Sequence, residues 1–380
     1  MLTESLTIVS VVSAVISAAM GVMFWLTVRR IGALHAISQV EGTGPTVSVI
    51  VPARNEQADL AAALRSICDQ EGVQLQVIVV NDHSSDQTGA IADSFAESDQ
   101  RVIVIHNPPL AAGWLGKANA METAFRQATG EFLVFADADV IHDRRCFISA
   151  LTEFQRHPTG MLSLLPKVIM ESFWENALLP HAVMAATVQF CAPGVNNPDS
   201  PHAAAAGAFM LVRRETVEQL HGLDCIKSDY LDDVALAKAV KRIGHDSRVI
   251  LAPDLVKVRL FKGNRDAFWG FTKNILMAVS NIWVAIPTMF LPIFVYWLPL
   301  VCLALGTVSL NWTMIAAGGS AYLIQACLLF PARKLCQFRW GKALFFPFNA
   351  LPVLCCFTMA LYYRLSRGSV AWRGRVVRIV

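Results

Sequence analysis

A chain with an uncharged apolar run of 23 residues, Leu6–Val28, has few ways to keep that run away from water. About 20 apolar residues suffice for a helix to cross a bilayer. Arg29 and Arg30 follow directly, whereas Glu4 and no lysine or arginine precede the run. A signal peptide has its positive charge first and a shorter core. The pattern predicts an uncleaved transmembrane anchor over residues 1–30, with the next domain on the cytoplasmic side of the inner membrane.

The composition agrees with a membrane-bound protein. Hydrophobic residues make up 54% of the 380 residues and charged residues 16%, whereas soluble domains are usually about 45–50% apolar and about 25% charged. The net charge is only +3, so no broad basic surface and no nucleic-acid partner are expected. Nine cysteines without a Cys-x-x-Cys pair favour reduced thiols over disulfides or a zinc site. A plain cytosolic enzyme and a disordered chain are excluded.

Residues 31–262 alternate short β-rich runs with segments of helical spacing. The predicted strands are 47–51, 77–80, 102–105 and 132–135, and the predicted helices are 60–68, 85–96 and 118–128. This alternation predicts an α/β domain with a mostly parallel sheet in three layers. Ligands of such sheets bind outside the carboxyl ends of the strands, which is where the polar clusters of this chain lie.

The last third of the chain is again apolar. Residues 263–285 interleave charged and aromatic side chains, which suits a helix in the membrane interface or, equally, an amphipathic helix packed on the domain. Residues 286–380 are expected to form a transmembrane region with a basic tail. Apolar blocks lie at about 276–310, 313–330 and 343–363. They allow two to four further spans.

Two polar clusters follow the first two predicted strands. The first contains Pro52, Asn55 and Glu56, and the second contains Asp82, Asp86 and Thr88. A carboxylate at such a strand end can accept hydrogen bonds from a nucleobase or a ribose hydroxyl. We assign Asp86 and Thr88 to capping of the next helix, where Asp and Thr are favoured, and Asp82 to binding.

A third cluster, Gly113–Lys117, precedes a predicted helix and lacks the spacing of a phosphate-binding P-loop. Its glycines allow a close approach of the backbone, and Lys117 can neutralise a phosphate. A lone lysine is more often a solvated charge, so this assignment depends on the other clusters.

A fourth cluster, Asp137-Ala138-Asp139, follows the strand 132–135. Two carboxylates so close together are costly unless a cation shares them. Oxygen ligands select hard cations, so Mg²⁺ or Mn²⁺ is the expected cofactor, bridging the carboxylates to substrate phosphates. Such an ion can stabilise a departing diphosphate as a Lewis acid.

The fifth cluster is the pair Asp232-Asp233 at the start of a helical segment. Acids at a helix start also interact favourably with the helix dipole, which is the alternative to a catalytic role. In the catalytic interpretation one of them is the general base for an acceptor hydroxyl. We favour Asp233 as the base and Asp232 as its support.

Together, these five clusters resemble the family 2 inverting glycosyltransferases with the GT-A fold. The resemblance implies a nucleotide-diphosphate sugar donor, often a UDP-sugar, bound by Pro52, Asn55, Glu56, Asp82, Lys117 and Asp137. It implies that Asp82 lies near the base or ribose. It also implies that Asp139 is the main metal ligand with Asp137 beside it, and that Asp233 is the catalytic base. Many family members have Glu where this chain has Asp232.

Further segments are similar to the membrane-anchored, hopene-associated glycosyltransferases of bacteria. These segments are Glu171–Glu175, Ala203–Gly207, Val212–Glu215 and Asp232–Ala237. The layout of one anchor and later spans also looks like that of ceramide and carotenoid glycosyltransferases. The resemblance implies transfer of a single sugar to a membrane lipid hydroxyl, in hopanoid or related lipid biosynthesis.

Three alternatives remain beside a lipid glycosyltransferase. A catalytically inactive scaffold of a lipid pathway is disfavoured by the intact acids. A processive polysaccharide synthase is disfavoured because Gln337–Trp340 is one residue short of the Gln-x-x-Arg-Trp motif. A nucleotidyltransferase would have a Gly-rich, Arg-containing loop near its start. A dinucleotide-dependent oxidoreductase is excluded because no Gly-x-Gly-x-x-Gly follows a strand.

Overall fold

The computed structural model describes residues 2–38, 44–191, 193–278, 293–333, 335–337, 350–366, 369–372 and 375–378. The chain divides into two compact units. The sheet unit comprises Thr27–Val168 and Thr187–Arg259, and the helical unit comprises Met1–Leu26, Ile169–Ala186 and Leu260–Val380. Residues 169–186 therefore group with the two ends of the chain, although they lie inside the segment 31–262 that we expect to be one domain. The division into four segments stays a prediction.

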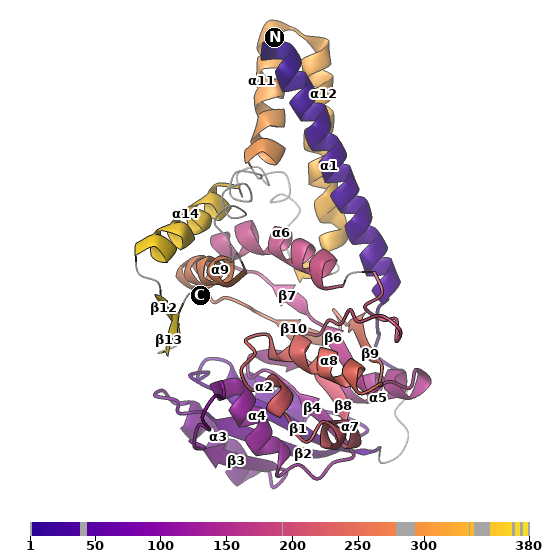
Figure 1. Cartoon of the computed structure of the whole chain (residues 1–380), viewed down its shortest axis with the longest axis vertical. Coiled ribbons are helices and arrows are strands. Elements are labelled where there is room, and N and C mark those ends of the chain that lie inside the picture. Colours follow the sequence, from indigo (N-terminus) through magenta and orange to yellow (C-terminus); the bar gives the residue numbers. More distant parts are fainter. Residues whose placement is uncertain are drawn as a thin grey trace. The chain divides into compact units, whose positions relative to one another are not determined.

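A seven-stranded sheet with the order β3-β2-β1-β4-β8-β6-β9 forms the sheet unit (Figure 1). The strands are β1 (Thr46–Ala53), β2 (Gln74–Asn81), β3 (Val102–His106), β4 (Phe132–Phe135), β6 (Met161–Leu165), β8 (Met210–Arg213) and β9 (Ser247–Leu251). Only β8 is antiparallel to its neighbours β4 and β6, so the predicted, mostly parallel α/β sheet is confirmed. In a second, smaller sheet, β10 (Val256–Val258) pairs antiparallel with β5 (Val140–His142) and parallel with β7 (Lys167–Ile169).

The helices of the sheet unit connect these strands. They are α2 (Leu60–Cys68), α3 (Thr88–Ser98), α4 (Gly116–Phe125), α5 (Cys146–Arg156), α7 (Arg214–Gln219), the short 3-10 helix η1 (Asp224–Ile226) and α8 (Asp232–Arg242). The bounds of α2 and β4 are those predicted, whereas α3 begins three residues later than predicted. Asp86 accepts the N–H of Thr88, the first residue of α3, at 3.0 Å. The N-cap residue of α3 is Gln87, which makes no side-chain cap bond, so neither Asp86 nor Thr88 occupies the capping position expected of them, although Asp86 satisfies the first N–H of the helix.

Helices cover both faces of the main sheet. Leu133 and Phe135 of β4 belong to a buried core that also contains Met121 of α4 and Leu236 of α8. Side chains alternate between the two faces of a strand, so Phe132 lies on the opposite face. There its ring meets Phe154 of α5 with the centroids 5.6 Å apart. The three-layer arrangement follows, and each fully buried Phe or Leu contributes about 1.5–3 kcal/mol.

The helical unit contains most of the long apolar helices. They are α1 (Leu2–Ile31), α6 (Phe173–Phe190), α9 (Asn264–Ala278), the π-helix η2 (Ile293–Trp297), α11 (Leu298–Ser309), α12 (Trp312–Ala332) and α14 (Ala350–Ser366). Short strands β11 (Cys336–Gln337), β12 (Ser369–Trp372) and β13 (Arg375–Arg378) complete it.

Among the described residues, one helix is long and apolar enough to cross a membrane. It is Thr3–Ile31, with a mean hydropathy of 2.2. The apolar helices Phe294–Ser309 and Leu351–Ser366 are shorter, so the C-terminal spans expected from the sequence are not clearly shown. Parts of the blocks 276–310 and 343–363, and residues 338–340 of the Gln337–Trp340 segment, lie outside the described residues.

A buried polar contact links three helices of the helical unit. Gln325 of α12 donates to Ser13 of α1 at 2.9 Å and to the carbonyl of Val295 in η2 at 2.6 Å. Ser13 donates to the same carbonyl at 2.6 Å. Such hydrogen bonds hold apolar helices together because their polar groups have few other partners. The N-terminal helix is thus part of a helix bundle.

A buried carboxylate joins the starts of α6 and α9. Glu175 is completely buried and accepts the N–H of Glu171 at 2.7 Å and that of Gly263 at 2.8 Å. The Trp174 ring packs on Phe268 of α9 with centroids 5.2 Å apart, in a cluster that includes residues of α14. Helix α9 is therefore packed within the helical unit, and its place relative to a bilayer stays a prediction.

Candidate active site

The loops that follow β1 and β2 are joined by hydrogen bonds. The N–H of Asn55 donates to Ser84 Oγ at 3.1 Å, and the Asn55 side chain accepts the N–H of Ser85 at 2.9 Å. The N–H of Glu56 donates to Thr88 Oγ1 at 2.8 Å. Glu56 is buried, and Pro52 is the seventh residue of β1. The first two predicted clusters thus form one edge of the sheet.

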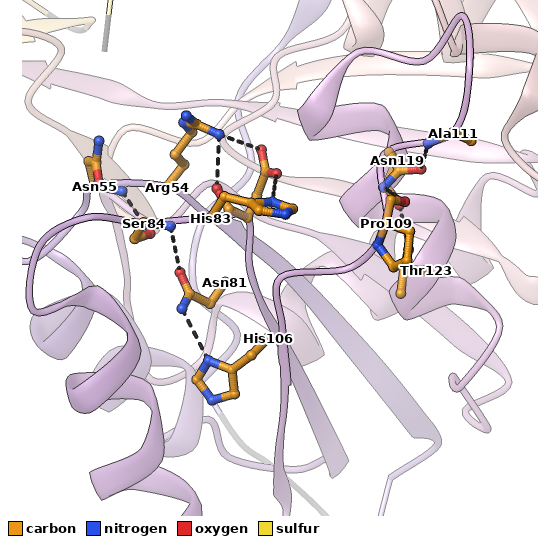
Figure 2. Close-up of polar contacts among 11 residues, drawn as sticks. Arg54, Asn55, Asn81, His83, Ser84, His106, Pro109, Ala111, Asn119 and Thr123 are labelled. Atoms are coloured by element: carbon orange, nitrogen blue, oxygen red, sulfur yellow. Dashed lines mark hydrogen bonds and ion pairs between the residues drawn. The ribbon is translucent and has the colours of Figure 1, made fainter. Parts of the chain in front are cut away.

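Arg54 and His83, which Figure 2 labels, both contact the carboxylate of Asp82. Its Oδ1 atom is 3.2 Å from His83 Nδ1, and its Oδ2 atom is 3.6 Å from Arg54 Nη1. The Asp82 side chain is only 7% exposed, against 25% for Arg54 and 46% for His83. Asp82 is therefore placed to orient Arg54 and His83. Neither Arg54 nor His83 is among the site residues predicted from the sequence, although each directly neighbours one of them.

Three residues with left-handed backbone follow β1, β2 and β3. They are Asn55, His83 and Asn107, with φ angles of 54°, 55° and 46°. Asn and His enter this region more readily than most residues, but a non-glycine residue there still costs on the order of 1–3 kcal/mol. Such strain gathers at binding sites more often than elsewhere, so this edge of the sheet has the features of a ligand site.

The loop before α4 is held by Asn119, as Figure 2 shows. Asn119 Nδ2 donates to the carbonyl of Pro109 at 3.1 Å, and Asn119 Oδ1 accepts the N–H of Ala111 at 3.4 Å. Gly113 makes the turn with a φ of 81°. The N–H of Leu115 then donates to the carbonyl of Lys227 at 2.7 Å. These contacts fix the start of α4, where Lys117 is the second residue.

Lys117 joins the third, fourth and fifth predicted clusters in one ion-pair network. Its Nζ atom is 2.8 Å from Asp137 Oδ1 and 3.1 Å from Asp232 Oδ2. Burial opposes the charge of the ammonium, but the two carboxylates outweigh this effect and hold the pKa of Lys117 above its usual value. Lys117 is therefore a fixed positive charge at the centre of the site, unlike the solvated lysine of the alternative interpretation.

Asp233 is the second residue of α8 and has two backbone donors. Its Oδ2 atom accepts the N–H of Gly207 at 3.0 Å, and its Oδ1 atom accepts the N–H of Val234 at 2.8 Å. Burial raises the pKa of Asp233 to about 6, against the lowering effect of Lys117 and with a smaller raising effect of Asp232. A carboxyl group with this pKa is ionised at neutral pH and basic enough to take up a proton.

Gly207 lies in the candidate site, although the sequence alone predicts no role for it. A Cβ atom at this position would lie 2.9 Å from Asp137 Oδ2 and 3.1 Å from Lys117 Nζ. Only glycine leaves room for both groups and still offers its N–H to Asp233. A glycine at the end of the small-residue run 203–206 is a signal of such a close approach.

Asp137 and Asp139 are candidate ligands for a divalent cation. Asp137 and Asp139 are partly buried carboxylates in the segment between β4 and β5, and Gly207 keeps the space beside Asp137 Oδ2 open. No group of three or more Asp, Glu, His or Cys residues within the described ranges forms a metal cage. Mg²⁺-type ions typically use one or two carboxylates plus substrate phosphates and water, which this pair can provide.

Comparison with known proteins finds a family that resembles part of the sheet unit. Residues 48–220 match the family model "Glycosyl transferase family 2". The match begins in β1 and covers the first four polar clusters, and it ends before the Asp232-Asp233 pair.

Three curated relatives are similar to parts of this chain. A beta-monoglucosyldiacylglycerol synthase of Trichormus variabilis is 28% identical over 37% of this chain and 30% of its own length. A probable glycosyltransferase, YdaM, of Bacillus subtilis is 29% identical over 54% of this chain and 48% of its own length. A 4,4′-diaponeurosporenoate glycosyltransferase of Staphylococcus aureus is 33% identical over 34% of each chain. The chain matches less than half the length of each of these relatives.

A solved structure shares the fold. It is a mannosyltransferase from Pyrobaculum calidifontis in complex with GDP-Man and Mn²⁺, with a TM-score of 0.55 and 21% identity. The match covers 95% of this chain and 99% of that one. The chain therefore shares the fold of this glycosyltransferase, and its residues 48–220 are similar to the family 2 glycosyl transferases.

Proposed function

We propose that this chain is a membrane-bound inverting glycosyltransferase that moves one sugar from a nucleotide-diphosphate donor to the hydroxyl of a membrane lipid. The observation that carries the proposal is the network in which Lys117 joins Asp137 and Asp232 beside Asp233. Sugar transfer from a diphosphate is promoted by a positive charge, by a pair of carboxylates that can bind a metal, and by a base of suitable pKa.

The nucleoside of the donor is assigned to the edge formed by the loops after β1 and β2. In this assignment Asp82 orients Arg54 and His83, the more exposed groups of that edge. Asn55 and Glu56 give the first loop its shape through their bonds to Ser84, Ser85 and Thr88, and Pro52 lies near the end of β1. UDP is the proposed nucleotide on the resemblance to family 2 enzymes. The structural neighbour was solved with GDP-Man, so the donor panel described below includes both nucleotides.

The chemistry proposed for Asp233 is general base catalysis. The two N–H groups of Gly207 and Val234 fix its carboxylate and leave it lone pairs that can accept the hydroxyl proton of the acceptor. The acceptor oxygen then bonds to the anomeric carbon from the side opposite the diphosphate. The bond from that carbon to the diphosphate oxygen breaks in the same displacement, so the configuration of the sugar inverts.

The leaving diphosphate is assigned to Lys117, Asp137 and Asp139. Lys117 offers a fixed positive charge to the phosphates, and Asp232 helps to hold that ammonium in place. Asp137 and Asp139 would hold Mg²⁺ or Mn²⁺. When bound, the cation would stabilise the negative charge of the diphosphate as a Lewis acid. The neighbour with Mn²⁺ supports a divalent ion without choosing between the two metals.

A lipid acceptor is proposed for two reasons. The chain begins with a helix long and apolar enough to cross a bilayer, which would keep the site close to a membrane. One relative is named for a diacylglycerol product and another for 4,4′-diaponeurosporenoate. With Arg29 and Arg30 at the cytoplasmic end of the helix, the site would face the cytoplasm. A hopanoid or related lipid is the proposed acceptor on the similarity of Glu171–Glu175 and Ala203–Gly207 to the hopene-associated enzymes.

Radiolabelled donors test this proposal. The purified protein in detergent would be incubated with UDP- and GDP-sugars, Mg²⁺ or Mn²⁺ and a bacterial lipid extract, and the label in the organic phase would be counted. We expect one donor to give metal-dependent label, and mass spectrometry to show one sugar per lipid. A long polysaccharide product would favour a processive synthase. No label with any donor, from folded protein, would favour the inactive scaffold.

A further inference from the structure

The loop 193–209 contributes to the site although it is far in sequence from Lys117 and Asp137. It has 17 residues without helix or strand, between α6 and β8. Loops longer than about 12–15 residues without regular structure are uncommon in compact domains and usually serve a function. This loop carries Gly207, whose N–H is one of the two donors to Asp233. So long a loop needs further contacts to hold the Gly207 N–H beside Asp233.

One lysine side chain holds the first half of this loop. Lys241, in the last turn of α8, directs its ammonium at four backbone carbonyl oxygens. The distances are 2.9 Å to Val195, 2.9 Å to Asn197, 3.1 Å to Ser200 and 2.8 Å to His202. An ammonium has three donors and no acceptor, so these carbonyls saturate it. Hydrogen bonds from a charged donor are roughly twice as strong as neutral ones.

Two further contacts join the loop to the sheet. The side chain of Asn196 and the backbone of Val249 in β9 exchange two hydrogen bonds of 2.8 Å. The N–H of Ala206 donates to Ser163 Oγ in β6 at 2.8 Å. The loop is thus tied to the end of α8 by Lys241, to the sheet by Asn196 and Ala206, and to the start of α8 at Asp233.

We propose that Lys241 is a positioning residue for the base Asp233. By fixing residues 195–202 on the last turn of α8, it sets the path of the loop so that the Gly207 N–H meets the carboxylate at the first turn of the same helix. Helix α8 thereby fixes both halves of the loop: Lys241 holds the first half and Asp233 holds the second. The inference rests on the proposed role of Asp233 in glycosyl transfer.

The variant Lys241→Met tests this proposal, with Lys238→Met as the matched control. Methionine keeps the unbranched stem of lysine and removes the three donors. Lys238 is exposed on the same helix, and it makes none of the contacts described for Lys241. For Lys241→Met we expect kcat to fall about tenfold or more and the KM of the donor to change less than about twofold, because none of the loop residues that Lys241 holds is assigned to donor binding. The control should match the wild type in both constants.

Hydrogen exchange gives a readout that does not depend on activity. In Lys241→Met, the amides of 203–209 should exchange about tenfold faster or more, while those of α4 stay as in the wild type. Unchanged exchange and kcat would overturn the proposal. Faster exchange throughout the sheet unit would overturn it too, because Lys241 would then be a general stabilising residue. Slower turnover with unchanged exchange in 203–209 would likewise contradict it.

A second variant tests the proposal if Lys241→Met does not fold. Lys241→Arg keeps the charge, but a planar guanidinium cannot match four convergent carbonyls as a compact ammonium does. It should fold, lower kcat about threefold and leave the donor KM unchanged; wild-type kcat and exchange would overturn the proposal. If the wild type shows no transferase activity, the proposed function fails while the exchange comparison still decides whether Lys241 fixes the loop.

Discussion

The candidate site depends most on the contacts that the Lys117 ammonium makes with two carboxylates. Lys117 lies within 3.1 Å of both Asp137 and Asp232, and without it three acidic groups would face one another in a partly buried space. Like charges that share such a space raise one another's pKa values. Lys117 therefore limits the rise of the pKa of Asp233.

The pKa of Asp233 predicts how the activity depends on pH. Burial raises this pKa to about 6, and the base must be ionised to accept a proton. The kcat/KM value should therefore be nearly constant at neutral pH and fall about tenfold for each pH unit below about 6. A pH–rate profile with the donor at low concentration measures this directly. A profile that stays flat down to about pH 5 would show that Asp233 is not the base.

Gly207→Ala tests the close approach at the centre of the site. The new methyl group would lie 2.9 Å from Asp137 Oδ2 and 3.1 Å from Lys117 Nζ, so one of them must move. We expect transfer to fall about tenfold or more, and the affinity for Mn²⁺ with nucleotide diphosphate to fall as well. Titration calorimetry and the transfer assay measure both effects.

The matched control for that variant is Gly319→Ala. There the nearest atom to an added Cβ is Leu303 Cδ1 at 3.8 Å, an ordinary contact. This variant should keep wild-type activity. Equal losses in the two variants would mean that the added methyl acts through stability and not through the site.

Sequence reasoning found the acidic residues of the site but not the contacts between them. Asp137, Asp232 and Asp233 stand out because acids at strand and helix ends are costly unless they have partners. Lys117 and Asp232 are separated by 115 positions, and only the packing of α4 beside α8 brings them together. Gly207 and Lys241 have no local signal beyond a small-residue run and a helix end, so their roles depend on tertiary structure.

At the scale of elements, Glu175 predicts a measurable effect on the helical unit. It is completely buried, and its carboxylate satisfies the N–H groups of Glu171 and Gly263. Glu175→Ala removes the carboxylate that two partly buried backbone donors share, and a hydrogen bond to a charged group contributes about 1.5–3 kcal/mol. Urea denaturation in detergent should show this loss of stability. The exposed residue Glu97 gives the control Glu97→Ala, and equal stability of the two variants would contradict the role of Glu175.

The accuracy of the sequence-based predictions differs among the helices and strands. The helix 60–68 and the strand 132–135 match the structure residue for residue, since each has a clear period and a polar boundary. Strands β6 and β8 were not predicted, because runs as short as Met161–Leu165 and Met210–Arg213 show no alternation that separates strand from helix. Strand β8 is also the antiparallel member of the sheet, and pairing direction is not encoded in a four-residue run.

At the scale of the whole molecule, two deletions separate anchoring from folding. Residues 1–26 belong to the helical unit, whereas Leu34 donates to the carbonyl of Leu251 at 2.7 Å inside the sheet unit. Deleting 2–26 should reduce retention in alkaline-washed membranes by about half or more and leave the sheet unit folded. Deleting 2–36 should also destabilise the sheet unit, because it removes the contact with β9.

Membrane fractionation and circular dichroism measure these outcomes. Full retention after deletion of 2–26 would mean that the C-terminal helices suffice for membrane attachment. A sheet unit that unfolds on deletion of 2–26 would make the N-terminal helix a structural element of that unit. Sequence reasoning predicted the anchor from its length and its flanking arginines, but it could not predict that Ser13 and Gln325 join it to a helix bundle.

The central claim is that Asp233 takes the proton of the acceptor in a site that binds the donor independently. Asp233→Asn keeps the size of the side chain and one of its two acceptor oxygens but removes the base. The decisive measurement compares donor binding, by titration calorimetry with Mn²⁺, and label transfer to lipid in wild type and Asp233→Asn. We predict that the donor affinity changes less than about threefold while transfer falls by about 10²–10⁴-fold. Wild-type transfer by Asp233→Asn would contradict the account, as would loss of donor binding together with transfer.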